Sequence, residues 1–242
     1  MSKKKLLLIT IISVLLGTVM SLAQETFSWE QYEKYGADKL TGKVNVANSP
    51  YFLSPDIYNL VSNSHITVIS KFKTRQQQTN FSCGPCVAAM VVNYYTGKDL
   101  HTEKEIAEIM GTSITKGTDL PGMKRYFDHL KWKTSSSLSS SSPKKYREFL
   151  NFVKKNLESK IPIMVENIDW GGHWRIIIGY DDMGTDSIKD DVLFMADPFD
   201  TSDHLQDGYN IISAERFFCM WFDAHLYKEG QRDKLWLTAV PQ

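Results

Sequence analysis

The stretch from Arg75 to Lys98 reads RQQQTNFSCGPCVAAMVVNYYTGK, with a glutamine run, a Cys-Gly-Pro-Cys motif and a run of small and apolar residues. The run predicts a helix that begins near Cys83 and ends at Gly97, since glycine often follows the last residue of a helix. The N-terminus of a helix stabilises a thiolate and so lowers the pKa of a cysteine there. The motif is therefore compatible with a redox dithiol or with a single nucleophilic cysteine, Cys83.

The rest of the chain is helical in its first half and rich in strands in its second half. Further helices are predicted over residues 102–110, 119–130 and 144–159, the first from a capping-box pattern at Thr102 and Glu105. Short strands are predicted within residues 65–75, 161–168, 173–182, 192–198 and 235–240. The serine-rich segment from Thr134 to Pro143 predicts a surface loop. Segregated helices and strands indicate an α+β fold.

The N-terminus has the pattern of a secretory signal peptide. Three lysines at positions 3–5 precede an apolar run over residues 6–20, and Ala23 offers a small residue for cleavage. The apolar run is shorter than the roughly 20 residues that span a membrane. We therefore expect a signal peptide over residues 1–23 and a bacterial protein that is secreted or periplasmic, with no integral membrane segment after cleavage. Residues 24–64 are then an N-terminal extension of unassigned role, and residues 65–242 form the main domain.

Charge and cysteine content narrow the classes of partner. The chain has 28 basic and 28 acidic residues, and removal of the three N-terminal lysines leaves a net charge of about −3. This balance argues against binding to nucleic acid or to a membrane surface. The 3 cysteines leave at least one free thiol, which suggests a reactive residue in an exported protein.

The redox interpretation has features against it. The residues before Cys83 are polar, whereas a thioredoxin-type site follows a buried strand, and Ser82 stands where that family has tryptophan. In that family an isoleucine-proline element faces the dithiol, and Ile161-Pro162 loosely resembles it. The interval of 76 residues from Cys86 to Pro162 (162 − 86) is too long for that compact fold. We expect Cys86 to be a small core residue behind the nucleophile, and oxidation to a bond with Cys83 stays open as an alternative.

A nucleophilic cysteine needs a base, a residue that orients the base, and donors for the oxyanion. His173 follows two glycines and enters an apolar strand, and Asp197 ends the next apolar strand, so adjacent strands would bring them together. The side-chain amide of a glutamine six residues before Cys83 would donate to the oxyanion, and Gln77 stands at that position (83 − 77). The residues alone do not distinguish Gln77 from Gln76 and Gln78 in this role. His225, near Asp223, is the competing base, but its flanks form a helical aromatic stripe typical of packing.

These residues resemble the C39-type papain-like cysteine peptidases over roughly residues 66–198. The resemblance rests on Gln77 with Cys83-Gly84-Pro85, Gly172-His173-Trp174, Gly179-Tyr180-Asp181 and Asp197-Pro198. It implies a helical lobe that carries the cysteine, packed against an antiparallel β lobe that carries the histidine and aspartate. It also implies a peptidase that hydrolyses peptide or related amide bonds through an acyl-enzyme and acts on a peptide or protein substrate.

By this resemblance Cys83 is the nucleophile, His173 the general base and acid, Asp197 the orienting residue, and Gln77 the oxyanion donor. No metal or other cofactor is expected, because the remaining histidines lack metal-ligand spacing. Cys219 is expected in the core. The segment YNIISAERFFCMWFDAHLY and the residues after it are expected to extend beyond the family pattern. A catalytically inactive binding module on the same fold, and a thiol-disulfide oxidoreductase, are the alternative functions.

Overall fold

The computed structural model describes residues 56–201, 206–224, 226–229 and 231–242. The predicted signal peptide, most of the N-terminal extension and His225 lie outside the described residues. The elements follow in the order η3 (Ile57–Asn59), β1 (Ile66–Val68), α3 (Cys83–Thr96), α4 (Glu103–Met110), α5 (Leu120–His129), β2 (Lys133–Ser136), α6 (Tyr146–Glu158), β3 (Ile163–Asn167), η4 (Asp169–Gly171), β4 (His173–Asp181), β5 (Val192–Ala196), β6 (Tyr209–Ser213), α7 (Ala214–Met220) and β7 (Trp236–Val240).

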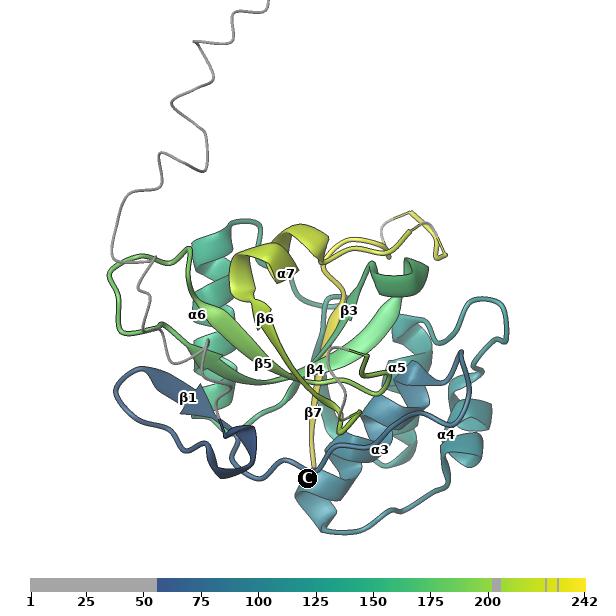
Figure 1. The fold of residues 1–242 in the computed structure, drawn as a ribbon. Coiled ribbons are helices and arrows are strands. Elements are labelled where there is room, and N and C mark those ends of the chain that lie inside the picture. The colour runs from purple at the N-terminus through teal and green to yellow at the C-terminus, as the bar shows by residue number, and fades with distance from the viewer. Residues whose placement is uncertain (1–55, 202–205, 225, 230) are drawn as a thin grey trace, which may run out of the picture. The chain divides into compact units, whose positions relative to one another are not determined.

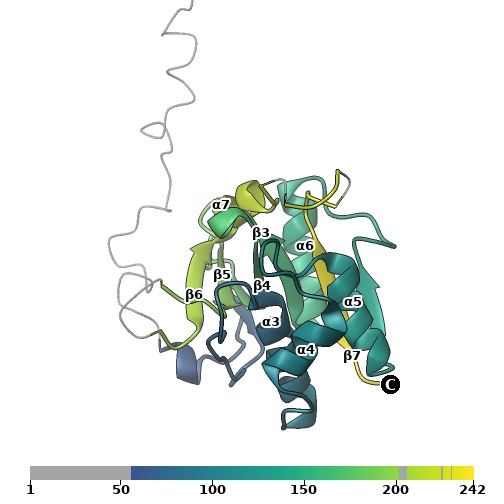
Figure 2. The same cartoon turned by 90° about the vertical axis from the view of Figure 1, so that its right-hand side faces the viewer.

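An antiparallel sheet runs through this domain in the order β2-β7-β3-β4-β5-β6. The strand β4 lies at its centre, with β3 and β1 along one edge and β5 along the other. In both Figure 1 and Figure 2 the helices α3, α4 and α5 form one group, and α7 lies at the opposite end of the sheet. The predicted α+β architecture, with a helical part and an antiparallel β part, is confirmed.

The helix α3 places Cys83 because its first ten residues, Cys83 to Val92, are all buried, and the helix packs against β4, α4 and α5. At its start, a Cβ on Gly84 would approach the Thr118 side chain to 2.7 Å, so only glycine permits this close packing. At its end, Gly97 adopts φ 73° and its N–H donates to the carbonyl of Asn93. Both predicted ends of the helix are confirmed.

The other predicted helices are also present. Thr102 caps α4 in a capping box with Glu105, as predicted. The helix α5 starts after Asp119, whose side chain accepts the N–H of Gly122. The helix α6 buries Phe149, among others, along the predicted apolar face.

Three expectations are wrong at least in part, and two elements were not predicted. Residues 134–136 of the serine-rich segment belong to β2 and pair with β7, so the predicted loop is shorter than expected. The elements β6 and α7 were not expected as defined elements. The residues Trp221–Ala224 are not helical, so the flank of His225 that the structure describes is not the predicted helical stripe. Cys219 is exposed instead of in the core, because α7 turns Ala214 and Phe217 inward.

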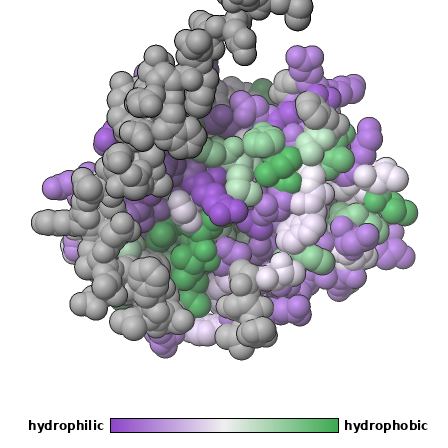
Figure 3. All heavy atoms as spheres, turned by 45° about the horizontal axis from the view of Figure 1, so that its top comes forward, coloured by the Kyte–Doolittle hydropathy of each residue, from purple (hydrophilic) through white to green (hydrophobic). Residues whose placement is uncertain are grey.

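The face shown in Figure 3 carries hydrophobic residues in small groups among hydrophilic ones. Within the described part of the chain, no helix is long and apolar enough to cross a membrane.

Candidate active site

Cys83 lies in a cleft at the N-terminus of α3 and is 7% exposed. Burial alone would raise the pKa of its thiol. The hydrogen bond and charge of His173, together with the backbone N–H groups of Trp174 and Gly84, outweigh burial and hold this pKa below its ordinary value. The site therefore favours the thiolate, which is the nucleophilic form of cysteine.

His173 is the first residue of β4, and its ring lies between the thiol and a carboxylate. Its Nε2–H donates to Asp197 Oδ1 at 2.7 Å, so Nδ1 is the ring nitrogen that remains for Cys83. Burial would lower the pKa of the imidazole, but the hydrogen bonds with Asp197 and Cys83 raise it. The pKa of the thiol and the pKa of the imidazole move in opposite directions, which favours a thiolate–imidazolium pair.

Asp197 follows directly after β5, and the pairing of β5 with β4 brings it to His173. Burial would raise the pKa of this carboxyl, but the hydrogen bond and charge of His173 and the charge of Arg175 hold it below its ordinary value. The backbone N–H of Phe199 also donates to Oδ1 at 2.9 Å. Asp197 is therefore an oriented anion beside the imidazole.

The three residues of the glutamine run make different contacts. Gln77 lines the cleft beside Cys83, and its Nε2–H donates to the carbonyl of Thr79 at 2.6 Å. Its Oε1 is buried without a hydrogen-bond partner among the described residues. Its backbone N–H donates to the carbonyl of Pro198 at 2.7 Å, which links this loop to the residue after Asp197.

Gln76 holds the loop that follows β5. Its Nε2–H donates to the carbonyl of Asp197 at 3.1 Å, and its Oε1 accepts the N–H of Asp200 at 3.0 Å. The backbone N–H of Gln78 donates instead to Glu103 Oε1 at 2.8 Å. Of the three glutamines, Gln77 is the one that lines the cleft with Cys83.

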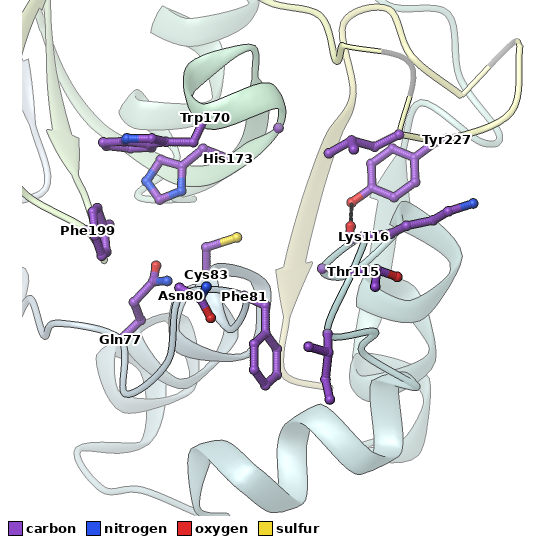
Figure 4. A pocket seen from close by; sticks show the side chains of 14 residues that line it. Gln77, Asn80, Phe81, Cys83, Thr115, Lys116, Trp170, His173, Phe199 and Tyr227 are labelled. Atoms are coloured by element: carbon purple, nitrogen blue, oxygen red, sulfur yellow. Dashed lines mark hydrogen bonds between the residues drawn. The ribbon is translucent and has the colours of Figure 1, made fainter.

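The cleft has a volume of about 370 Å³ and two apolar walls (Figure 4). Trp170 and Phe199 stand on the side of His173, and their ring centroids are 5.0 Å apart. Phe81 lies on the other side, and Ile114 also lines the cleft. Lys116 is the charged residue of the lining apart from the Cys83 and His173 pair, and no carboxylate of the described residues lines the cleft.

A family model described as "Peptidase_C39 like family" matches residues 66–221, which is more than half of the chain. The chain belongs to the Peptidase_C39 like family. The predicted resemblance to C39-type peptidases is confirmed. The match extends beyond Pro198 into α7, so the expectation that this later segment departs from the family pattern is wrong up to residue 221.

Solved structures similar to this C39-like chain include the peptidase domain of Streptococcus ComA, a bi-functional ABC transporter involved in a quorum-sensing pathway. It is 20% identical over 71% of this chain and 99% of that one, with a TM-score of 0.48. The peptidase domain of Streptococcus mutans ComA is 16% identical over 70% and 100%, with a TM-score of 0.42. A double-glycine-motif protease from an AMS/PCAT transporter, in complex with a leader peptide, is 14% identical over 74% and 100%, with a TM-score of 0.45. No curated protein matches the chain.

Behind the cleft of the C39-like domain lies a buried acid that sequence analysis missed. Glu166 of β3 is 0% exposed, and neither carboxyl oxygen has a hydrogen-bond partner within the described ranges. Burial, followed by the charges of Asp223 and Cys83, raises its pKa to about 10. A Cβ on Gly172, the residue before His173, would lie 2.6 Å from Glu166 Oε1, so a larger residue here would force the Glu166 side chain to shift.

Glu103 is a second acid that sequence analysis missed. Its Oε1 accepts the hydroxyl of Ser82 at 2.5 Å as well as the N–H of Gln78, and so fixes the loop between Gln77 and Cys83. Its place directly after a helix cap gave no indication of this role. Its partners come together only when α4 packs on α3.

Cys86 is fully buried and its Sγ lies 3.7 Å from the carbonyl of Arg75. Burial, with the charge of Glu103, raises the pKa of its thiol far above the ordinary value. Cys86 and Cys83 are both free thiols. Cys86 therefore has the properties of the core residue that the sequence predicts.

Proposed function

We propose that this protein is an exported cysteine peptidase that hydrolyses peptide bonds through Cys83, His173 and Asp197. One observation carries the proposal. The oppositely shifted pKa values of Cys83 and His173 belong to a hydrogen-bonded pair at a cleft, and Asp197 orients the imidazole from its far side. Export is proposed from the signal-peptide pattern of residues 1–23.

In the proposed reaction the Cys83 thiolate attacks the carbonyl carbon of the scissile bond and forms a tetrahedral intermediate. The imidazolium of His173 gives its Nδ1 proton to the leaving amine, and an acyl-enzyme remains. Water then attacks the thioester while His173 accepts a proton from it, and the thiolate leaves. Asp197 holds the ring so that Nδ1 faces Cys83 in both steps.

Two donors are proposed for the oxyanion. The backbone N–H of Cys83 lies in the first turn of α3, where N–H groups have no intrahelical partner. The side-chain amide of Gln77 lies in the same cleft, and it would leave the carbonyl of Thr79 to reach the intermediate. The Glu103 contacts hold the loop between these two donors.

The apolar walls support a peptide substrate. Trp170 is 61% exposed and Ile114 is 77% exposed, and both line the cleft. Trp170 and Phe81 stand on opposite sides of Cys83 (Figure 4). Exposed apolar surface around a cleft is typical of a binding site. An extended peptide across Cys83 would place side chains against both walls.

The alternatives have less support. A thiol-disulfide oxidoreductase does not need a base on its first cysteine, whereas Cys83 is hydrogen-bonded to His173, which Asp197 orients. An inactive binding module has no use for a thiolate–imidazolium pair, whose formation costs burial of two charges.

Peptide-library cleavage tests the proposal. The full chain is expressed with its own N-terminus, collected from the culture supernatant and incubated with a library read by mass spectrometry. We expect cleavage by the wild type and by Cys86→Ala, and none by Cys83→Ser. Turnover that persists in Cys83→Ser would remove the nucleophile, and acceleration of insulin reduction that is lost in Cys86→Ala would favour the redox alternative.

Export is tested separately by N-terminal sequencing of the secreted protein. The expected first residue is Gln24. A protein that stays with the cells and keeps residues 1–23 would contradict export without touching the chemistry.

A further inference from the structure

Arg175 is a buried cation two residues after His173 on the same strand. Its Nε lies 2.8 Å from Asp197 Oδ2, and its Nη2 lies 2.5 Å from Asp169 Oδ2. The Nε–H bond is not aimed at its acceptor, so the contact with Asp197 is an ion pair without a directed hydrogen bond. The Arg175 side chain is 5% exposed, and the Asp197 side chain 1%.

Burial of a guanidinium is costly unless its charge is paired. The two carboxylates meet different nitrogens of the Arg175 fork, which a single ammonium group could not reproduce. Asp197 in turn uses one oxygen for His173 and the other for Arg175. The carboxylate that orients His173 is therefore held from two sides.

Asp169, the second partner of Arg175, lies directly before Trp170 of the cleft wall. Asp169 is the first residue of η4, and the next residue, Trp170, has φ 52° and ψ 23°. A left-handed conformation is strained for a side chain of this size and persists only where the surroundings hold it. The Trp170 ring lies 4.9 Å from the ring of His173 and 5.0 Å from that of Phe199, edge to face in both cases.

We propose that Arg175 is a positioning residue that ties the carboxylate orienting His173 to the turn that carries Trp170. The contacts form one chain, from Cys83 through His173, Asp197 and Arg175 to Asp169. The catalytic imidazole and the wall beside it are thereby held by a single side chain. The inference rests on the proposed function, because it assigns Arg175 a role in orienting the proposed base.

The pKa of His173 depends on the charged groups that surround its ring. Cys83 faces the ring from α3 and Asp197 faces it from the end of β5. Arg175 reaches His173 through its ion pair with Asp197, and Asp169 does so through its ion pair with Arg175. The charge of Cys83 contributes to the raised pKa of Glu166 of β3, which is therefore protonated at neutral pH.

The substitution Arg175→Lys keeps the positive charge but cannot bridge both carboxylates. We expect the Asp197 carboxylate to lose its fixed orientation, so that the pKa of His173 falls toward the ordinary value. The NMR signals of the histidine rings, with the His173 signal assigned by its loss in His173→Ala, measure this pKa without any substrate. On the best peptide of the library, kcat/KM should fall by up to about 10²-fold, as misplacement of a catalytic group does.

Asp169→Asn tests the other end of the chain, where the side chain is 25% exposed and the risk to folding is lower. It should also lower the pKa of His173, because it removes one negative charge and releases the Trp170 turn. Arg125→Lys is the matched control. This arginine donates to the carbonyl of Met110 at 2.6 Å and does not line the cleft, so its replacement should leave both readouts unchanged.

A raised His173 pKa that persists in Arg175→Lys, with wild-type kcat/KM, would overturn this inference alone. If Arg175→Lys fails to fold, as judged by its urea unfolding curve, Asp169→Asn decides, and an unchanged His173 pKa there overturns the inference. An ordinary His173 pKa in the wild type would overturn the proposed function together with the inference.

Discussion

Replacement of Glu166 by glutamine should stabilise the protein by an amount that increases with pH. Burial and the charges of Asp223 and Cys83 raise the pKa of this carboxyl to about 10, against an ordinary value of 4.5. Between these values the folded protein holds a proton that the unfolded chain releases. Unfolding is therefore favoured as pH rises through this window.

The magnitude follows from the two pKa values. Each pH unit above 4.5 costs the wild type about 1.4 kcal/mol of unfolding free energy, so the cost at pH 7 is about 3 kcal/mol (1.36 × 2.5). Glutamine has nearly the same shape and no proton to lose. The stability gained in Glu166→Gln should therefore grow by roughly 4 kcal/mol between pH 5 and pH 8.

Urea unfolding at pH 5, 6, 7 and 8, extrapolated linearly to water, measures this difference. Glu158→Gln at the exposed end of α6 is the control for introducing an amide. Peptidase activity at pH 7 should persist in Glu166→Gln, because Glu166 is already neutral there. A difference in unfolding free energy that is flat across these pH values would refute the buried, protonated state of Glu166.

Three further substitutions test the site. Gln77→Ala should lower kcat by about 10²–10³-fold, as loss of one oxyanion donor does, and steady-state kinetics would show it; an unchanged kcat argues against that donor. Asp197→Asn removes the charge that raises the pKa of His173, so the alkaline limb of the pH–rate profile should move to lower pH, and a limb that stays in place contradicts the assignment. Gly172→Ala would bring a Cβ within 2.6 Å of Glu166 Oε1, and urea unfolding should show a loss of about 1–3 kcal/mol; full stability would show that the site can relax.

Local patterns in the sequence predict the elements whose ends are fixed by neighbouring residues. The start of α3 at Cys83 and its end at Gly97 need only a run of small and apolar residues and a glycine that adopts the left-handed conformation. The capping box of Thr102 and Glu105 is likewise complete within four residues. Both features are visible before any tertiary contact forms.

Features that depend on distant partners were missed. Residues 134–136 of the serine-rich segment join a strand because residues 133–136 pair with residues 237–240 across the fold. Arg175 stands out in the sequence as a charge next to the apolar run of β4, but its partners Asp169 and Asp197 meet it only in the folded chain. Glu166 looks like an ordinary solvated glutamate until β3 is enclosed on both edges by β4 and β7.

The rate of alkylation of Cys83 by iodoacetamide, followed against pH by mass spectrometry of its peptide, tests the central claim most directly. We expect the rate to rise at a pH below the ordinary thiol pKa of about 8.5, and this inflection to move upward in His173→Ala. An inflection at the ordinary thiol pKa, unchanged in His173→Ala, would contradict the thiolate–imidazolium pair and the peptidase built on it.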